Sequence, residues 1–283
     1  MRRGFVGGTS VPLLLTLAKG VLTGFGKRPA ADAPLPAERP TAPAVRVDPG
    51  RVAAYARVCG FPAPGTAVPL TYPHVLGFPL AARLMARRRF PLPLLGLVHT
   101  AIEITQHRPL LPSETPDITV HARELRAHRR GVEVVVVTEA RIDGAVVWED
   151  RSTYLARTGG PAPTAAPPEA RRPLPEVARW RLAADLGRRH AAVSGDWNPL
   201  HVHPLTARPL GFPRAIAHGM WTVARCAAEV VPGTARGVVL RARFAAPVLL
   251  PTTVVHAADA GAFELRSADD PSRLHLTGSV RLL

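Results

Sequence analysis

Cysteine, lysine and aromatic side chains are all scarce in this chain, and each shortage argues against a class of protein. Only two of the 283 residues are cysteine, Cys59 and Cys226, which is too few for the disulfide framework of a small secreted domain. We expect both thiols to be free and buried, in a protein of the reducing cytoplasm. Phe, Trp and Tyr together make up 5% of the residues, so few rings are available to stack on nucleic-acid bases.

Negative charge is also in short supply, because 21 acidic residues face 36 Lys and Arg and leave a formal net charge of +15. The only lysines are Lys19 and Lys27, and the arginine clusters are spread along the chain at residues 87–89, 129–130, 171–172 and 188–189. No zinc-finger, helix-turn-helix or RNP motif accompanies them. We therefore predict no nucleic-acid partner. A basic protein that binds nucleic acid or a membrane surface stays a rival, which steeply salt-dependent binding would reveal.

A hydrophobic run long enough to span a bilayer is missing as well. Residues 11–25 are apolar and follow Met1-Arg2-Arg3, as in a signal peptide. Lys19 interrupts this run, and a membrane span needs about 20 apolar residues. We favour an N-terminal arm that packs on the protein body or a membrane surface over a cleaved signal, and membrane association is the less expected of the two. Residues 28–44 are rich in Pro and Ala, so residues 1–44 are predicted to form an arm and a linker.

The remaining chain is long enough and apolar enough for a large core. Its 47% hydrophobic content supports one large or two modest domains of about 100 to 200 residues each. The first unit is predicted over residues 45–157, with turn signals at Arg130-Gly131 and Asp143-Gly144. Its expected elements are helices at residues 49–59 and 75–88, then strands at residues 94–105, 118–125, 132–141 and 145–155.

A second Pro- and Ala-rich stretch, residues 161–173, marks the best domain boundary, inside a linker over residues 158–175. The second unit, residues 176–283, repeats the plan of helices followed by antiparallel strands. Its expected helices cover residues 183–193 and 219–231, and its strands cover residues 237–244, 252–258, 262–266 and 274–282. The two halves therefore look like copies of one plan.

The densest chemical signal is the stretch Ser194-Gly195-Asp196-Trp197-Asn198-Pro199-Leu200-His201. It sets a carboxylate and an imidazole five residues apart on a segment that proline stiffens, and the amide of Asn198 could orient either group. An enzyme that adds water to an enoyl thioester must activate the water and protonate the neighbouring carbon. Asp196 and His201 could share both tasks. Taken alone, however, an Asp-x-Asn-Pro segment is more often an ordinary turn.

The second part of the signal is Gly211-Phe212-Pro213-Arg214-Ala215-Ile216-Ala217-His218-Gly219-Met220. Apolar residues recur after it at helical spacing, which predicts a helix that begins near Gly219. The bare amide of a glycine at a helix N-terminus can donate to a thioester oxygen that becomes an enolate. His218, just before the helix, is interpreted as a capping or packing residue and not as a base.

Together these residues resemble the signature of the MaoC-like hydratases, also called type 2 enoyl-CoA hydratases or (R)-specific dehydratases. The resemblance implies an α+β hotdog fold, in which a curved antiparallel sheet wraps a long helix. It also implies that Asp196 and His201 hold the catalytic water and that Gly219 supplies the oxyanion amide. We assign Gly195, Asn198 and Gly219 to substrate binding. His190 departs from the pattern, because the family usually has an aromatic residue there.

The first unit has no counterpart of this loop, since the corresponding place holds Cys59-Gly60-Phe61-Pro62-Ala63-Pro64-Gly65. This asymmetry resembles the double-hotdog dehydratases, in which the N-terminal repeat has lost catalysis and shapes the acyl pocket. Residues 68–73 and 99–109 look like those of the mycobacterial-type 3-hydroxyacyl-thioester dehydratases. Within them, Tyr72 and His99 are interpreted individually as packing residues.

The resemblance implies a hydro-lyase that interconverts (3R)-3-hydroxyacyl and trans-2-enoyl thioesters in fatty-acid metabolism, without a cofactor. The carrier can be coenzyme A or an acyl carrier protein, since arginine suits the phosphates of the first and the acidic surface of the second. Asp196, His201 and His203 suggest a metal site, but no third spaced ligand cluster follows, so no metal is predicted. A non-catalytic acyl-thioester binding protein is the alternative, and a monomeric double hotdog and a homodimer both stay open.

Overall fold

The computed structural model describes residues 16, 19–20, 23–24, 26–62, 67–94, 96–158, 173–233 and 235–283. Most of the predicted apolar arm at residues 11–25 and of the predicted linker at residues 158–175 lies outside these residues, as does the end of the stretch at residues 59–65. Within the described ranges, no helix is both long enough and apolar enough to cross a membrane.

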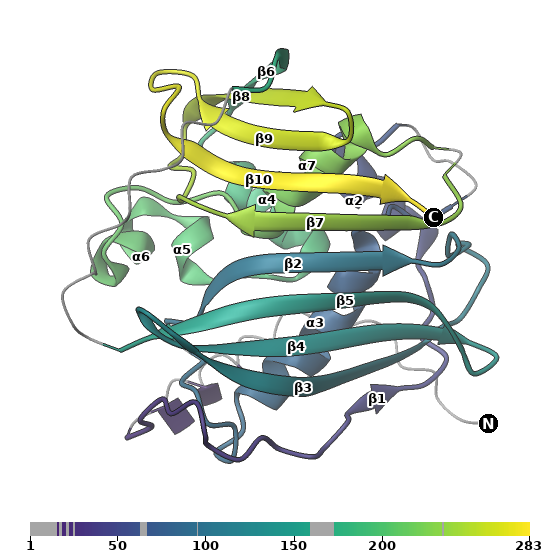
Figure 1. Ribbon diagram of the computed structural model, residues 1–283, viewed down its shortest axis with the longest axis vertical. Helices are drawn as coiled ribbons and strands as arrows, with labels where there is room; N and C mark the ends of the chain where they lie inside the picture. Colours follow the sequence, from purple (N-terminus) through teal and green to yellow (C-terminus); the bar gives the residue numbers. More distant parts are fainter. Residues whose placement is uncertain are drawn as a thin grey trace.

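The strands of the described residues form one antiparallel sheet with the order β1-β3-β4-β5-β2-β7-β10-β9-β8-β6. In chain order these are β1 (Thr41–Ala42), β2 (Val98–Gln106), β3 (Asp117–His128), β4 (Gly131–Ile142), β5 (Ala145–Arg157), β6 (Glu176–Leu182), β7 (Val238–Phe244), β8 (Thr252–Asp259), β9 (Ala262–Ser267) and β10 (Leu274–Leu282). The first unit supplies β2 to β5, the segment before it adds β1, and the second unit supplies β6 to β10. Figure 1 shows the two sets as the lower and upper halves of one curved surface.

The two halves meet where β2 pairs with β7, with Ile102 opposite Ala242 and Ile104 opposite Leu240. Each half places a helix against the same side of the sheet, α3 (Tyr72–Met85) in the first and α7 (Gly219–Val230) in the second. Pairing at the centre leaves neither half with an open inner edge. The predicted α+β double hotdog is therefore confirmed.

Helix α2 (Pro49–Cys59) links the two units on the helical side of the sheet. Its N-cap is Asp48, whose carboxylate accepts from the main-chain N–H groups of Gly50 and Arg51. The indole N–H of Trp221, on α7, donates to the carbonyl oxygen of Val58 at 2.8 Å. Because α2 also packs on α4 (Leu186–Ser194), the first unit touches both helices that flank the sequence signature.

Several element boundaries differ from the sequence prediction. Strand β6 was not predicted; its residues are mostly exposed, and it lies at the edge of the sheet, where it pairs with β8 alone. Part of the predicted N-terminal linker is strand β1, which pairs with β3. Helix α3 begins three residues before the predicted start at residue 75, and β2 begins at Val98 instead of residue 94.

A continuous apolar core joins the two units, and both cysteines lie in it. Cys59 and Cys226 are free and fully buried, which confirms the expectation. Burial raises the pKa of the Cys59 thiol to about 12, so the thiolate, which is the reactive form, is scarce near neutral pH. Burial also raises the pKa of the Cys226 thiol well above its usual range.

Candidate active site

The loop that carries Asp196 is fixed where α4 ends. Gly195 caps the helix with φ of 80°, and its N–H donates to the carbonyl oxygen of Ala191 at 2.8 Å. Glycine adopts this left-handed conformation without a steric penalty. The turn sends the chain away from α4 at Asp196. Gly195, which we assigned to substrate binding, thus has a clear structural task in the geometry of the loop.

Asn198 holds the Asp196 carboxylate through its main chain. Its backbone N–H donates to Asp196 Oδ1 at 3.2 Å, while its side-chain Oδ1 accepts from the N–H of Leu200 at 3.2 Å and caps helix α5 (Pro199–Val202). The predicted orienting amide of Asn198 is therefore engaged with α5. The orienting bond to Asp196 comes from the peptide group instead.

His201, on α5, has a defined proton position. Its Nδ1 lies 2.9 Å from the carbonyl oxygen of Ile216, and a carbonyl can only accept, so Nδ1 carries the proton. The second ring nitrogen, Nε2, then carries a lone pair. Gly187 lets α5 approach α4 this closely, because a Cβ at Gly187 would lie 1.8 Å from the carbonyl oxygen of His201.

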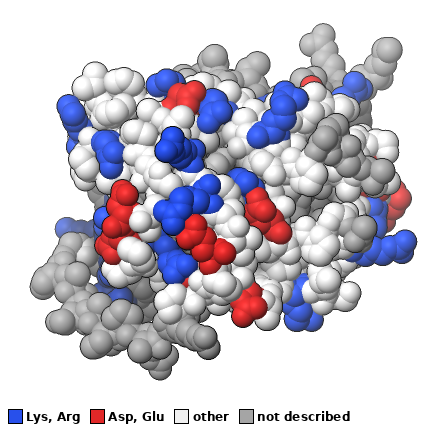
Figure 2. All heavy atoms as spheres, turned by 90° about the horizontal axis from the view of Figure 1, so that it is seen from above, with Lys and Arg blue, Asp and Glu red and all other residues white. Residues whose placement is uncertain are grey.

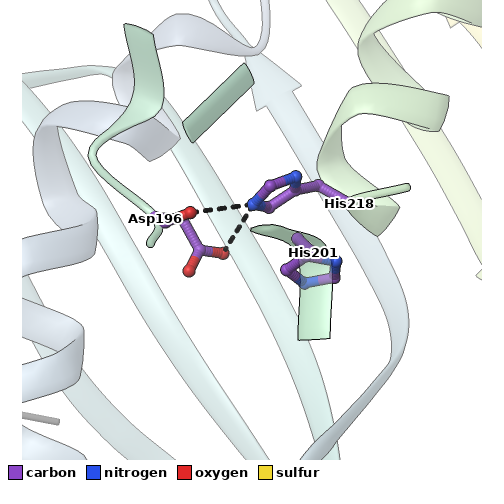
Figure 3. Close-up of side chains that lie close together, drawn as sticks. All are labelled: Asp196, His201 and His218. Carbon is purple, nitrogen blue, oxygen red and sulfur yellow. Dashed lines mark hydrogen bonds and ion pairs between the residues drawn. The ribbon is translucent and has the colours of Figure 1, made fainter. Parts of the chain in front are cut away.

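His218 completes a cluster with Asp196 and His201 (Figure 3). Its Nε2 lies 2.9 Å from the main-chain oxygen of Asp196 and 3.8 Å from the Oδ2 atom. Its ring stacks on that of His201, with 3.7 Å between centroids. His218 is the N-cap residue of α7, but its side chain makes no cap hydrogen bond, so of the two predicted roles, capping or packing, the side chain has the packing role. A histidine directly before a glycine at a helix start was the sequence signal that could have placed it in the site.

His190 packs on the far side of this cluster, at the position where an aromatic residue was expected. It is only 2% exposed, and its ring centroid lies 4.5 Å from that of His218 and 6.0 Å from that of Tyr55. Its Nε2 has no hydrogen-bond partner among the described residues. The imidazole of His190 therefore takes the place of an aromatic ring in the packing.

Burial keeps the histidines of the cluster neutral. It lowers the pKa of His201, although the nearby Asp196 carboxylate and the bond to Ile216 act in the opposite direction. It places the pKa of His218 and of His190 well below the usual range, and the neighbouring imidazoles add to both shifts. Because imidazole normally titrates near pH 6.5, all three rings are uncharged at neutral pH.

Gly219 opens α7 beside the cluster, and its N–H has no acceptor within the described chain. The N-terminal amides of a helix favour negative charge. The position is also tight, since a Cβ at Gly219 would lie 2.9 Å from the Cε1 atom of Phe244. A helix that begins at Gly219, as predicted, is confirmed.

Residues of the first unit form the side of the candidate site next to Gly219 and Phe244. His99 stacks on Tyr154, with 4.6 Å between centroids, and lies 4.9 Å from the ring of Phe244. Tyr72 is 2% exposed and packs edge-on against Tyr55 at 5.2 Å. Both contacts agree with the packing interpretation of His99 and Tyr72. The contacts of His99 with Tyr154 and Phe244 bring β2 and β5 of the first unit close to the Gly219 end of α7.

The cluster has the residue types of a metal site. One nitrogen of each histidine and one Asp196 oxygen all lie within 4.8 Å of one another. However, His218 Nε2 donates its proton to the Asp196 carbonyl, so this nitrogen offers no lone pair to a cation and only Nδ1 of His218 keeps one. His203 stays outside, exposed, with its Nδ1 accepting from the N–H of Leu205 at 3.1 Å. The donor set suits a water molecule better than a metal, and the absence of a metal stays a prediction.

Comparison with known proteins gives consistent results. Residues 165–265 match the family model described as the MaoC like domain. The 3-hydroxyacyl-thioester dehydratase X of Mycobacterium tuberculosis is 40% identical over 225 residues, which is 77% of this chain and 79% of that protein. A crystal structure of HtdX from the same species covers 87% of this chain and all of its own, with 37% identity and a TM-score of 0.77. A MaoC-like dehydratase from Phytophthora capsici, at 17% identity, covers 90% of this chain and 98% of its own and shares the fold with a TM-score of 0.68.

Proposed function

The chain belongs to the MaoC-like dehydratase family, and from that premise we propose that it is a hydro-lyase of fatty-acid metabolism. It reversibly converts (3R)-3-hydroxyacyl thioesters to trans-2-enoyl thioesters and water, with Asp196 and His201 as the catalytic pair. The observation that carries the proposal is the bond from His201 Nδ1 to the Ile216 carbonyl. It fixes a basic nitrogen lone pair on the ring that stands beside Asp196.

The pair is arranged to bind one water molecule. The lone pair on His201 Nε2 and the Asp196 carboxylate are both acceptors, and water has two protons to donate. With both protons engaged, a lone pair of the water oxygen is left to attack C3 of the enoyl chain. His218 supports this arrangement from behind, because it holds the main chain of Asp196 and stacks on His201.

The proton that leaves the water is the proton that reaches C2, and Asp196 and His201 transfer it. Neutral His201 and ionised Asp196 hold no spare proton, so the proton that they take from water is the one that they return to C2. The oxygen bonds to C3, and the electron pair of the double bond moves to the C2 side as the enolate before C2 is protonated. Dehydration runs the same steps backwards. The two groups share the acid and base tasks.

The thioester oxygen receives its hydrogen bond from the N–H of Gly219. That amide is the first of α7, where the helix dipole favours the charge that develops on the enolate. Asn198 and Gly195 shape the same loop, and the first unit, which lacks such a loop, walls the acyl chain with His99 and Tyr154. The protein acts in the cytoplasm on a thioester of coenzyme A or of an acyl carrier protein.

The loss of the conjugated enoyl absorbance of crotonyl-CoA and of trans-2-octenoyl-CoA tests the proposal. We expect turnover by the wild-type protein and a loss on the order of 100- to 10,000-fold in kcat for Asp196→Asn, the range for a lost general acid–base group. Asp185→Asn is the matched control, because the Asp185 side chain is half-exposed and, among the described residues, its ion pair is with the exposed Arg189.

Turnover by Asp196→Asn at the wild-type rate would contradict the assignment of the pair. Tight binding of the octenoyl thioester without any turnover, by a folded wild-type protein, would instead favour the non-catalytic acyl-thioester binding protein. The same acyl chain is then offered on an acyl carrier protein. Turnover of that form would show an enzyme that prefers the carrier-bound substrate, and no turnover of it would support the non-catalytic binding protein.

A further inference from the structure

The chain leaves the candidate active site after His201 and returns to it at Ile216. Its ends are tied together, since the N–H of Ile216 donates to the Leu200 carbonyl at 3.1 Å and His201 Nδ1 bonds to the Ile216 carbonyl. Residues 203–214 between these ties, which include α6 (Pro204–Ala207), are called the docking segment below. Anything that binds this segment sits next to the catalytic histidine.

The docking segment presents apolar side chains to solvent. Leu205 is 65% exposed and Leu210 is 37% exposed, whereas Ala207 between them is buried and anchors the segment. Most residues around them are exposed as well. Large exposed apolar side chains that gather on one segment are typical of a surface that another molecule covers.

The charge of this surface has one sign. Arg208 and Arg214 are exposed on the docking segment, and Arg188 of α4 reaches it with a guanidinium nitrogen 3.5 Å from the Val202 carbonyl. Arg208 and Arg188 have no acidic partner within the described chain, and no Asp or Glu occurs between Asp196 and Glu229. Basic and acidic groups are mixed on the face in Figure 2, where blue and red side chains lie side by side. The docking segment therefore favours an acidic partner.

We propose that the docking segment binds an acidic carrier protein, which presents the acyl chain to Asp196 and His201 on its thioester arm. The proposal rests on the hydro-lyase function, because it names the carrier of that substrate. A second copy of this chain fits the surface poorly, since like charges would face each other around a symmetry axis. The phosphates of free coenzyme A could pair with the arginines but would leave the two leucines exposed. An acidic protein surface satisfies both the charge and the apolar groups.

Steady-state kinetics with two forms of one substrate test this inference. The probes are trans-2-octenoyl acyl carrier protein and trans-2-octenoyl-CoA, and the variant is Arg208→Glu with Arg214→Glu. We expect kcat/KM for the carrier-bound chain to fall at least tenfold, mainly through KM, while kcat/KM for the coenzyme A form stays within about twofold. Arg236→Glu with Arg281→Glu is the matched control, because both arginines are exposed near the start of β7 and the end of β10, at the end of the sheet opposite α5 and α6 (Figure 1). Leu205→Ser should raise KM for the carrier form without reversing any charge.

Three outcomes would overturn the proposal. Equal losses in the docking variant and the remote control would show a general effect of net charge. Carrier-substrate kinetics that neither the charge reversal nor Leu205→Ser changes would show that the segment is not the contact. A change from dimer to monomer in the docking variant, measured by sedimentation, would assign the segment to a second copy of the chain. If the wild-type protein turns over neither substrate, the hydro-lyase function itself fails, and direct titration with the carrier protein still decides whether it binds the segment.

Discussion

His218 donates the proton on its Nε2 to the main-chain carbonyl oxygen of Asp196, 2.9 Å away. The bond ties the start of α7 to the loop after α4, so the oxyanion amide and the carboxylate keep a fixed separation. His218 is 2% exposed, and a buried carbonyl that loses its donor costs about 1–3 kcal/mol. His218 is thus a positioning residue, which acts through Asp196.

Substitution of His218 should therefore lower turnover according to the donor that replaces the imidazole. His218→Phe keeps a ring but removes the N–H, and we expect kcat to fall on the order of 10- to 100-fold as Asp196 shifts. His218→Gln retains an N–H donor and should recover part of that loss. Stopped assays with the octenoyl thioester would measure both variants. Equal activity of the two would show that the hydrogen bond has no part in positioning.

Gly187→Ala should disturb the active site, although Gly187 is not one of the proposed catalytic or substrate-binding residues. The added Cβ would lie 1.8 Å from the carbonyl oxygen of His201, so α5 must move and carry the base with it. We expect a loss of about 1–3 kcal/mol in the free energy of unfolding, as for other overpacked positions, and a fall in kcat beyond what the remaining folded fraction explains. Gly233→Ala is the control, because nothing lies within 4 Å of a Cβ there. Unchanged kcat in Gly187→Ala would mean that α5 tolerates the shift.

The fit between Gly219 and Phe244 can be tested by a pair of changes. Gly219→Ala alone pushes its Cβ to 2.9 Å from the Phe244 ring, so the helix start must shift and the oxyanion bond weakens. We expect a fall in kcat on the order of 100-fold, as for other lost oxyanion donors. Phe244→Leu in the same chain removes the clash and should restore part of the rate. A double variant no better than Gly219→Ala would place the defect elsewhere, and the assay is again the enoyl absorbance.

Acid should destabilise the protein through His99. Burial lowers the pKa of His99 to about 3, below the value of about 6.5 for the unfolded chain. The unfolded state therefore takes up a proton that the folded state refuses, and the contribution of neutral His99 to stability is lost as the pH falls from about 6.5 towards 3. His99→Phe keeps the stack on Tyr154 and cannot titrate. Urea unfolding of both proteins over this range should show the wild type losing stability relative to the variant, and parallel pH profiles would refute the effect.

Much of this architecture could be read from local sequence pattern. The helix at residues 49–59 and the strand at residues 274–282 match the structure at both ends, because capping and apolar alternation are local signals. The same holds for the helix start at Gly219. Strand β6 escaped prediction because its alternation is short: Ala178, Trp180 and Leu182 alternate with Arg179 and Arg181, and as an edge strand it pairs on one side alone. Strand β1 escaped because its pairing with β3 depends on residues far along the chain.

The sequence alone determined which residues we propose for the chemistry, since the spacing from Asp196 to His201 and the glycine at the start of the second-unit helix are local features of the chain. The tertiary structure decided the rest. It brought His218 to Asp196 across 22 positions in the chain, gave the orienting bond to the Asn198 peptide instead of its amide, and set the proton of His201 through Ile216. Those contacts depend on how the helices and loops around α7 pack against one another, and packing between distant segments leaves no periodic trace in the sequence.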